Sequence, residues 1–194
     1  DTPTFKEQVD QGGTVGYVIV ALGIVSLLLA LSRLLALSVM SAKVSSQLKN
    51  AEPNTNNPLG RVLKVAKDNE DTDRETLELK LSEAIFKERP ALESGLAFLK
   101  IISVVAPLMG LLGTVTGMIN TFQAITLFGT GDPKLMAGGI SQALVTTVEG
   151  LVVAIPTVLL HTIVSGRSRK VMHILQEQSA GIIAERDESG ASHS

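Results

Sequence analysis

The sequence ISQALVTTVEGLVVAIP, residues 140–156, lies at the centre of an apolar run that is long enough to cross a membrane. The run extends from Leu135 to Gly166 and contains one formally charged residue, Glu149. A carboxylate in the middle of such a segment costs about 2.5 kcal/mol or more unless it is neutralised, paired or hydrated. The run therefore predicts a membrane helix and makes Glu149 a candidate functional residue.

Two further segments are free of charge over a comparable length, from Gln11 to Ser32 and from Ile101 to Gly131. Because a helix needs about 20 apolar residues to cross a bilayer, the sequence predicts three transmembrane helices. We assign them to residues 14–40, 99–127 and 137–165. The predicted fold is an all-α membrane protein whose helices continue as long extensions into the cytoplasm.

Lysine and arginine are distributed unevenly between the segments that flank the spans. Residues 41–100 contain ten of them, whereas residues 1–13 and 129–136 contain one each. Because positive residues are retained on the cytoplasmic side, this asymmetry predicts a periplasmic N-terminus and a cytoplasmic C-terminus. The predicted periplasmic parts are a lead-in at 1–13 and a loop at 128–136, and the predicted cytoplasmic parts are a helical region at 41–98 and a tail at 166–194.

The composition excludes several classes of protein. Cysteine is absent and the three histidines are scattered, which excludes disulfides and thiolate metal sites and argues against a histidine metal site. The net charge of −2 does not predict a nucleic-acid-binding surface. The sequence contains no nucleophile–base set, phosphate loop or metal cluster, so we expect neither an enzyme nor a cofactor. A chain that begins at Asp1 is typical of a mature form or a fragment.

Local patterns predict the helices of the cytoplasmic parts. Thr72 followed by Glu75 fits a capping box at a helix start, and Pro90 predicts a kink before the second span. The last residues, 188–194, are expected to be disordered. Two apolar stripes at helical spacing predict faces that pack on neighbouring helices: Leu77, Leu81, Ala84 and Ile85, and Val171, Ile174, Leu175 and Ile182.

The second predicted span carries glycine and polar residues on more than one face. Gly113 and Gly117 have a spacing that allows close packing of membrane helices. At about 100° per residue, Thr114 and Thr121 share one face and Asn120 lies on the opposite one. A span that is polar on two sides is expected to be buried in an assembly.

In the third predicted span, Thr147 and Glu149 point in different directions, about 200° apart around the helix, and Glu149 shares its face with Gln142. The rise per residue places Thr147 and Thr114 of the second span at a similar depth, where they would form a hydroxyl layer near mid-membrane. The alternative is that each hydroxyl bonds a carbonyl of its own helix and has no other role.

The strings APLMGLLGTVTGM (106–118) and ISQALVTTVEGLVVAIP (140–156) resemble the two signature spans of the MotA/TolQ/ExbB proton-channel family. Three spans resemble the ExbB/TolQ branch, since MotA proteins have four. The resemblance implies a homo-pentamer in the bacterial inner membrane, with a pore around the single-span helices of an ExbD- or TolR-like partner that carries a membrane Asp. It also implies that proton motive force drives work on a TonB-like protein for outer-membrane uptake, and that Thr114 and Thr147 are the pore threonines.

One position departs from the family pattern. Many ExbB and TolQ proteins have Glu where this chain has Gln142, whereas this chain has Glu149 seven residues further on, on the same face. One hypothesis is that Glu149 replaces the function of the missing glutamate, and the other is that it is a structural group, neutral or paired at a helix contact. Arg33 lies about 10 Å deeper in the membrane, so a direct pair within one subunit is not expected.

The candidate residues for the pore wall and proton pathway are therefore Thr114, Thr121, Gln142, Thr147 and Glu149. The expected partners are further copies of the chain, the ExbD- or TolR-like protein, the TonB-like protein and lipids. Two alternative functions remain open. The chain could serve as a TolQ-like motor subunit for envelope maintenance, or as a non-conducting membrane scaffold whose polar residues only hold helices together.

Overall fold

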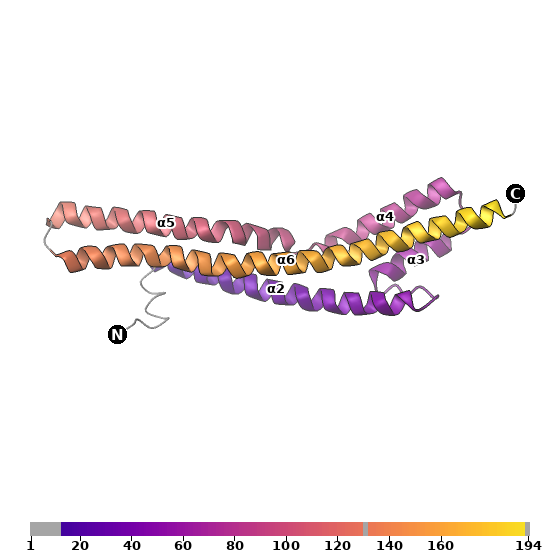
Figure 1. Cartoon of the computed structure of the whole chain (residues 1–194), viewed down its shortest axis with the longest axis horizontal. Coiled ribbons are helices and arrows are strands. Elements are labelled where there is room, and N and C mark those ends of the chain that lie inside the picture. The colour runs from indigo at the N-terminus through magenta and orange to yellow at the C-terminus, as the bar shows by residue number, and fades with distance from the viewer. Residues whose placement is uncertain (1–12, 130–131, 193–194) are drawn as a thin grey trace. The chain divides into compact units, whose positions relative to one another are not determined.

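The structure is a computed structural model that describes residues 13–129 and 132–192, and within these ranges the chain forms helices and no strand (Figure 1). The helices are α2 (Gly13–Leu48), α3 (Pro58–Asp68), α4 (Arg74–Leu92), α5 (Leu96–Phe128) and α6 (Pro133–Ala191). The all-helical prediction is confirmed for the described residues. The predicted lead-in lies outside them, apart from Gly13.

Helices α2, α5 and α6 are long and apolar enough to cross a membrane, which agrees with the three predicted spans. Each helix extends beyond the span assigned to it, and α6 alone has 59 residues. Between α5 and α6 the chain turns at Gly129, whose φ of +81° is a conformation that glycine adopts without strain. The three spans are therefore parts of longer helices.

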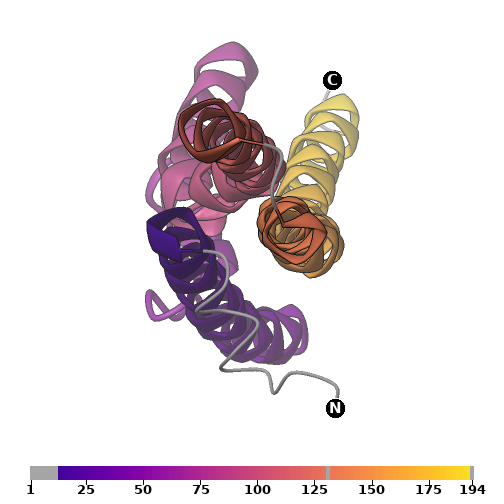
Figure 2. The ribbon, with the colours of Figure 1, turned by 90° about the vertical axis from the view of Figure 1, so that its left-hand side faces the viewer.

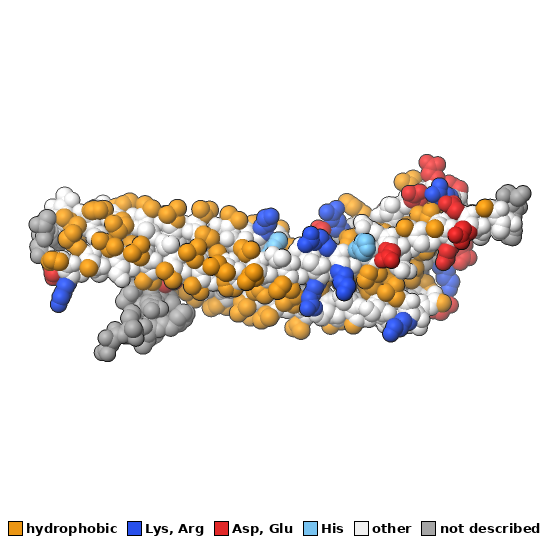
Figure 3. Space-filling model, in the orientation of Figure 1, with side chains coloured by type: hydrophobic (Ala, Val, Ile, Leu, Met, Phe, Trp, Pro, Cys, Tyr) orange, Lys and Arg blue, Asp and Glu red, His pale blue; other side chains and the backbone are white. Residues whose placement is uncertain are grey.

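The chain divides into two compact units. The first, which we call the membrane unit, comprises the chain up to Leu31 and Ala97–Thr162; the second, which we call the charged unit, comprises Ser32–Leu96 and the chain from Ile163 onward. Hydrophobic side chains cover the visible face of the membrane unit, and most charged side chains in this view gather on the charged unit (Figure 3). Seen end-on, α2, α5 and α6 form three adjacent columns in the membrane unit (Figure 2).

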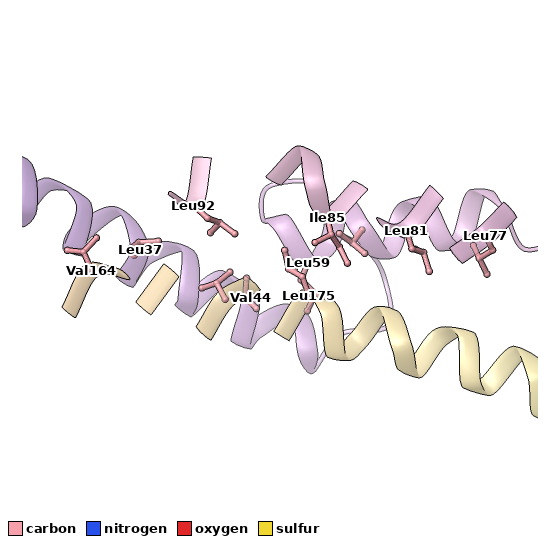
Figure 4. Close-up of a cluster of buried hydrophobic side chains, with 11 residues drawn as sticks. Leu37, Val44, Leu59, Leu77, Leu81, Ile85, Leu92, Val164 and Leu175 are labelled. Carbon is pink, nitrogen blue, oxygen red and sulfur yellow. The ribbon is translucent and has the colours of Figure 1, made fainter. Parts of the chain in front are cut away.

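The core of the charged unit is built from four helices (Figure 4). Both predicted stripes contribute to it: Leu77, Leu81 and Ile85 of α4 are buried, as are Val171 and Leu175 of α6. They pack with Leu37 and Val44 of α2, Leu59 and Val62 of α3, Leu92 of α4 and Val164 of α6. The heptad spacing of the α2 residues keeps one side of that helix facing its neighbours.

A polar network holds the loop between α2 and α3. Gln47 donates from Nε2 to the carbonyl oxygens of Asn50 (3.2 Å) and Glu52 (3.0 Å), and its Oε1 accepts from the backbone N–H of Asn54 (2.8 Å). Asn57 caps α3 by accepting from the Gly60 N–H at 2.7 Å. Because Gln47 and Asn57 are buried, these bonds satisfy groups that would otherwise be costly.

Three local predictions are corrected by the structure. The N-cap of α4 is Asp73, not Thr72: its carboxylate accepts from the Thr76 N–H at 3.2 Å, and this bonding lowers the pKa of the Asp73 carboxyl. After Pro90 the chain does not continue as a kinked helix into α5, because α4 ends at Leu92 and Gly95 takes a φ of +81°. The tail is helical to Ala191.

Replacement of Gly60 by alanine tests the packing of the loop. A Cβ on Gly60 would overlap the backbone carbonyl of Asn54, so we expect Gly60→Ala to lower the free energy of unfolding of the purified protein by about 1–3 kcal/mol. The matched control is Gly181→Ala in α6, where a Cβ meets open space and removal of a helical glycine is expected to stabilise by about 0.5–1 kcal/mol. Equal thermal melting of the two variants would contradict this packing.

Candidate functional site

Helices α5 and α6 approach each other closely through small residues in the membrane unit. A Cβ added to Gly110 would lie 2.8 Å from the carbonyl oxygen of Thr146, and one added to Gly150 would lie 2.6 Å from that of Ala106. A Cβ on Gly117 would lie 2.7 Å from the Cβ of Ala143. The two backbones are thus in direct contact, as small residues allow in lipid.

This approach brings the two predicted pore threonines together. The hydroxyls of Thr114 and Thr147 contact each other, and both lie near the same carbonyl groups. Thr114 Oγ1 is 3.0 Å from the oxygen of Ala143 and 3.1 Å from that of Gly110, and Thr147 Oγ1 is 3.5 Å from the oxygen of Gly110. Since a hydroxyl has one proton and two lone pairs, the pair keeps unused acceptor capacity. The two hydroxyls therefore lie at one level along α5 and α6 within a single chain.

Most other threonines of the membrane helices bond a carbonyl of their own helix, which is the alternative role considered above. Thr116, Thr121, Thr126 and Thr162 each donate to the carbonyl oxygen four residues earlier in the same helix. Thr121 is buried at the contact with Gly139, and its hydroxyl bonds within its own helix. Thr147 differs because its contacts are with groups of α5.

A second face of α6 carries Gln142, Thr146 and Glu149. The Thr146 side chain, 2% exposed, lies 2.7 Å from the carbonyl oxygen of Ala143 and 3.2 Å from that of Gly110. Gln142 is exposed. Both carboxylate oxygens of Glu149 are buried and have no hydrogen-bond partner within the described residues. An acid in that setting requires a proton or water.

Helix α2 packs against the continuation of this face in the membrane unit. A Cβ added to Gly23 would lie 2.8 Å from Cγ2 of Val153. The hydroxyls of Ser26 and Thr157 lie 3.1 Å apart. The Ser26 and Thr157 side chains are only 3% and 2% exposed. Neither this pair nor Thr146 was predicted from the sequence as a site residue, although each is a hydroxyl residue within an otherwise apolar segment.

Arg33 donates hydrogen bonds to carbonyl oxygens at the C-terminal end of α4. Its Nη2 donates to the carbonyl oxygens of Ala91 at 2.8 Å and of Leu92 at 3.3 Å. Helix C-terminal carbonyls attract cations, so this contact satisfies part of the guanidinium group. Its Nε remains buried without a partner among the described residues.

An all-helical chain with three helices able to span a membrane, and with hydroxyls and an acid at their contacts, defines a multi-pass membrane protein with a polar layer inside the bilayer. Within that class, the chain belongs to the MotA/TolQ/ExbB proton channel family, whose sequence model matches residues 54–177. The match includes α5 and the part of α6 that carries Thr147 and Glu149.

Individual relatives agree with this assignment. A putative biopolymer transport protein ExbB homolog of Methanothermobacter thermautotrophicus is 31% identical over 180 residues, covering 84% of this chain and 64% of the relative. A putative ExbB-like protein 1 of Synechocystis is 33% identical, covering 79% and 68% respectively. The Tol-Pal system protein TolQ of Pseudomonas aeruginosa is 36% identical, covering 46% and 38%. The chain thus matches less than two thirds of the length of several relatives.

Substitution of Gly110 tests whether the contact of α5 with α6 holds the threonines together. We expect Gly110→Ala to force the helices apart, since the new Cβ meets backbone atoms of α6, and to reduce stability by about 1–3 kcal/mol in thermal unfolding of the detergent-solubilised protein. Gly138→Ala is the control, because a Cβ there meets nothing within 4 Å. An unaltered melting temperature for Gly110→Ala would refute the close contact.

Proposed function

We propose that this chain is the ExbB-type subunit of a proton-driven motor in the bacterial inner membrane. In this proposal it forms a homo-pentamer in which α5 and α6 line a pore around the single-span helices of an ExbD- or TolR-like partner. The motor converts proton motive force into work on a TonB-like protein for outer-membrane uptake. Family membership and the ExbB names of relatives support the proposal. The distribution of lysine and arginine supports a periplasmic N-terminus.

The paired hydroxyls of Thr114 and Thr147 are the observation that carries the mechanism. Threonine does not titrate near neutral pH, so these side chains can donate and accept hydrogen bonds but cannot store a proton. The titrating group that faces them is the membrane Asp of the partner. The hydroxyls provide a polar wall beside which a charged carboxylate is tolerated and from which a neutral one departs easily.

Protonation of the partner's Asp removes its charge and lets the partner helix move relative to the wall. The membrane potential supplies about 2.3 kcal/mol per elementary charge per 100 mV, to which the pH difference adds. A wall of two hydroxyls suits this cycle, because each can reorient its proton as the carboxyl gains or loses one. The close contact through Gly110 keeps the wall in place during the movement.

TolQ-like service in envelope maintenance is the second candidate, and the similarity to the Pseudomonas TolQ protein favours it. The ExbB-type and TolQ-type functions use the same hydroxyl wall and differ in the protein that the motor drives. Copurification from the native membrane distinguishes them. A TonB-like partner supports the ExbB-type function, and proteins of a Tol-Pal system without a TonB-like one support the TolQ-type function.

Replacement of Thr147 by valine distinguishes a motor from a non-conducting scaffold. Valine keeps the shape but removes the hydroxyl, so we expect Thr147→Val to reduce proton flux by tenfold or more in proteoliposomes that contain the chain and its partner. Thr162→Val is the matched control, because Thr162 bonds only its own helix. Assembly, followed by size-exclusion chromatography, should be unchanged in both variants. Wild-type flux in Thr147→Val would support the scaffold.

A further inference from the structure

A cavity of about 720 Å³ lies in the membrane unit between the start of α2, α5 and the first turns of α6. Its polar lining is supplied by Thr14 of α2, by Thr116, Asn120 and Thr121 of α5, by Gln142 and Thr146 of α6, and by Asp132 at the turn between these helices. A single water needs only about 10–15 Å³ of such space together with two to four polar partners. The cavity has room for several waters, which these polar groups would hold along one side of a lining otherwise built of Gly, Ala, Val, Ile and Met.

Glu149 follows Thr146 by one turn on the same face of α6 but is not itself one of the residues that line the cavity. Gln142, Thr146 and Glu149 occupy successive turns, each about 5–6 Å from the next along the helix. Gln142 and Thr146 line the cavity, and both oxygens of Glu149 are buried without a partner in the described part of the chain. The buried acid therefore follows the last polar group of the cavity wall.

On the other side of Glu149, α2 packs against α6. One turn further along α6, Val153 fills the space beside Gly23, and beyond it the buried hydroxyls of Ser26 and Thr157 face each other. At these positions α2 and α6 are in direct contact. Glu149 thus lies between the polar cavity and this helix contact.

Among the described residues of the membrane unit, none forms a hydrogen bond or ion pair with the Glu149 carboxylate. Helix α2 carries no charged residue between Gly13 and Leu31, and α5 carries none between Ile101 and Phe128. The remaining charged or titratable groups of the unit's described residues are Lys100 and His161 near one end of the spans, Asp132 and Lys134 at the other, and Tyr17 on α2, which is 53% exposed. Protonation or hydration has to satisfy the carboxyl.

We propose that this cavity is a water-filled half-channel that carries protons to and from Glu149 from the side of the α5–α6 turn. In the orientation of the proposed function, on which this inference rests, that side is the periplasm. Protons pass from Asp132 at the mouth along water bonded to Asn120, Gln142 and Thr146, and one binds a carboxylate oxygen of Glu149. Glu149 itself lies about 200° around α6 from Thr147, so the chain has a proton-binding group of its own besides the hydroxyl wall.

Cysteine accessibility tests the cavity, and the chain contains no native cysteine to interfere. Asn120→Cys and Gln142→Cys should react with a membrane-impermeant, positively charged methanethiosulfonate added from the periplasmic side at least tenfold faster than Leu144→Cys. Leu144 is the matched control because it lies on the exposed apolar face of α6. Equal rates at all three positions, or reaction only from the cytoplasmic side, would overturn the half-channel.

Isotope exchange at Glu149 tests the route without any need for transport. In protein reconstituted in lipid without the partner, the infrared difference between wild type and Glu149→Gln isolates the carboxyl stretch of Glu149. We expect this band to shift on transfer to D₂O, and modification of Gln142→Cys by a bulky thiol reagent to slow that shift tenfold or more, while modified Leu144→Cys has no effect. A carboxyl band that is absent at every pH, or an exchange rate that modification at position 142 leaves unchanged, contradicts the inference.

These readouts separate the inference from the proposed function. If Thr147→Val retained full proton flux while Glu149 exchanged through the cavity, the hydroxyl wall would be wrong and the half-channel would stand. If Thr147→Val lost flux while Glu149 failed to exchange, the motor would stand and the half-channel would be wrong.

Discussion

The close approach of α5 and α6 is the constraint on which the rest of the membrane unit depends. In lipid, a polar group without a partner costs several kcal/mol, and no bulk water is available to satisfy it. Gly110 and Gly150 allow the two backbones to touch, and the touching backbones place the hydroxyls of Thr114 and Thr147 against each other and near shared carbonyl oxygens. A larger residue at either glycine would separate these groups.

Thr147 and Glu149 of α6 differ in their chemistry and point in different directions from the helix. Thr147 contributes a hydroxyl that cannot titrate, and Glu149 contributes an acid that can. In the proposed function the first serves as a wall beside a moving charge, and in the proposed half-channel the second binds a proton. The two proposed tasks are kept apart by the angle of about 200° between the two positions.

The three spans and the positions of the threonines were predictable because charge-free length and helical periodicity are local properties of the sequence. The same holds for the stripes that form the core of the charged unit, such as Leu77 and Leu81.

The Gln47–Asn57 network was not predictable, since an Asn- and Pro-rich loop indicates a break but not which amide bonds to which carbonyl. The cavity was also not predictable, because it depends on how the start of α2 lies against two helices far away in the sequence. The choice of Asp73 over Thr72 as the cap of α4 shows that two good capping residues in succession leave the helix start ambiguous by one residue.

The central claim is that Thr114 and Thr147 act as one polar wall, and a double-mutant cycle on proton flux tests it most directly. Flux would be measured in proteoliposomes for Thr114→Val, Thr147→Val and the double variant, each assembled with the partner. If the two hydroxyls act as a unit, the double variant loses no more flux than the more damaged single variant. If the fold-loss of flux in the double variant equals the product of the fold-losses in the two single variants, the hydroxyls act independently and the account is contradicted.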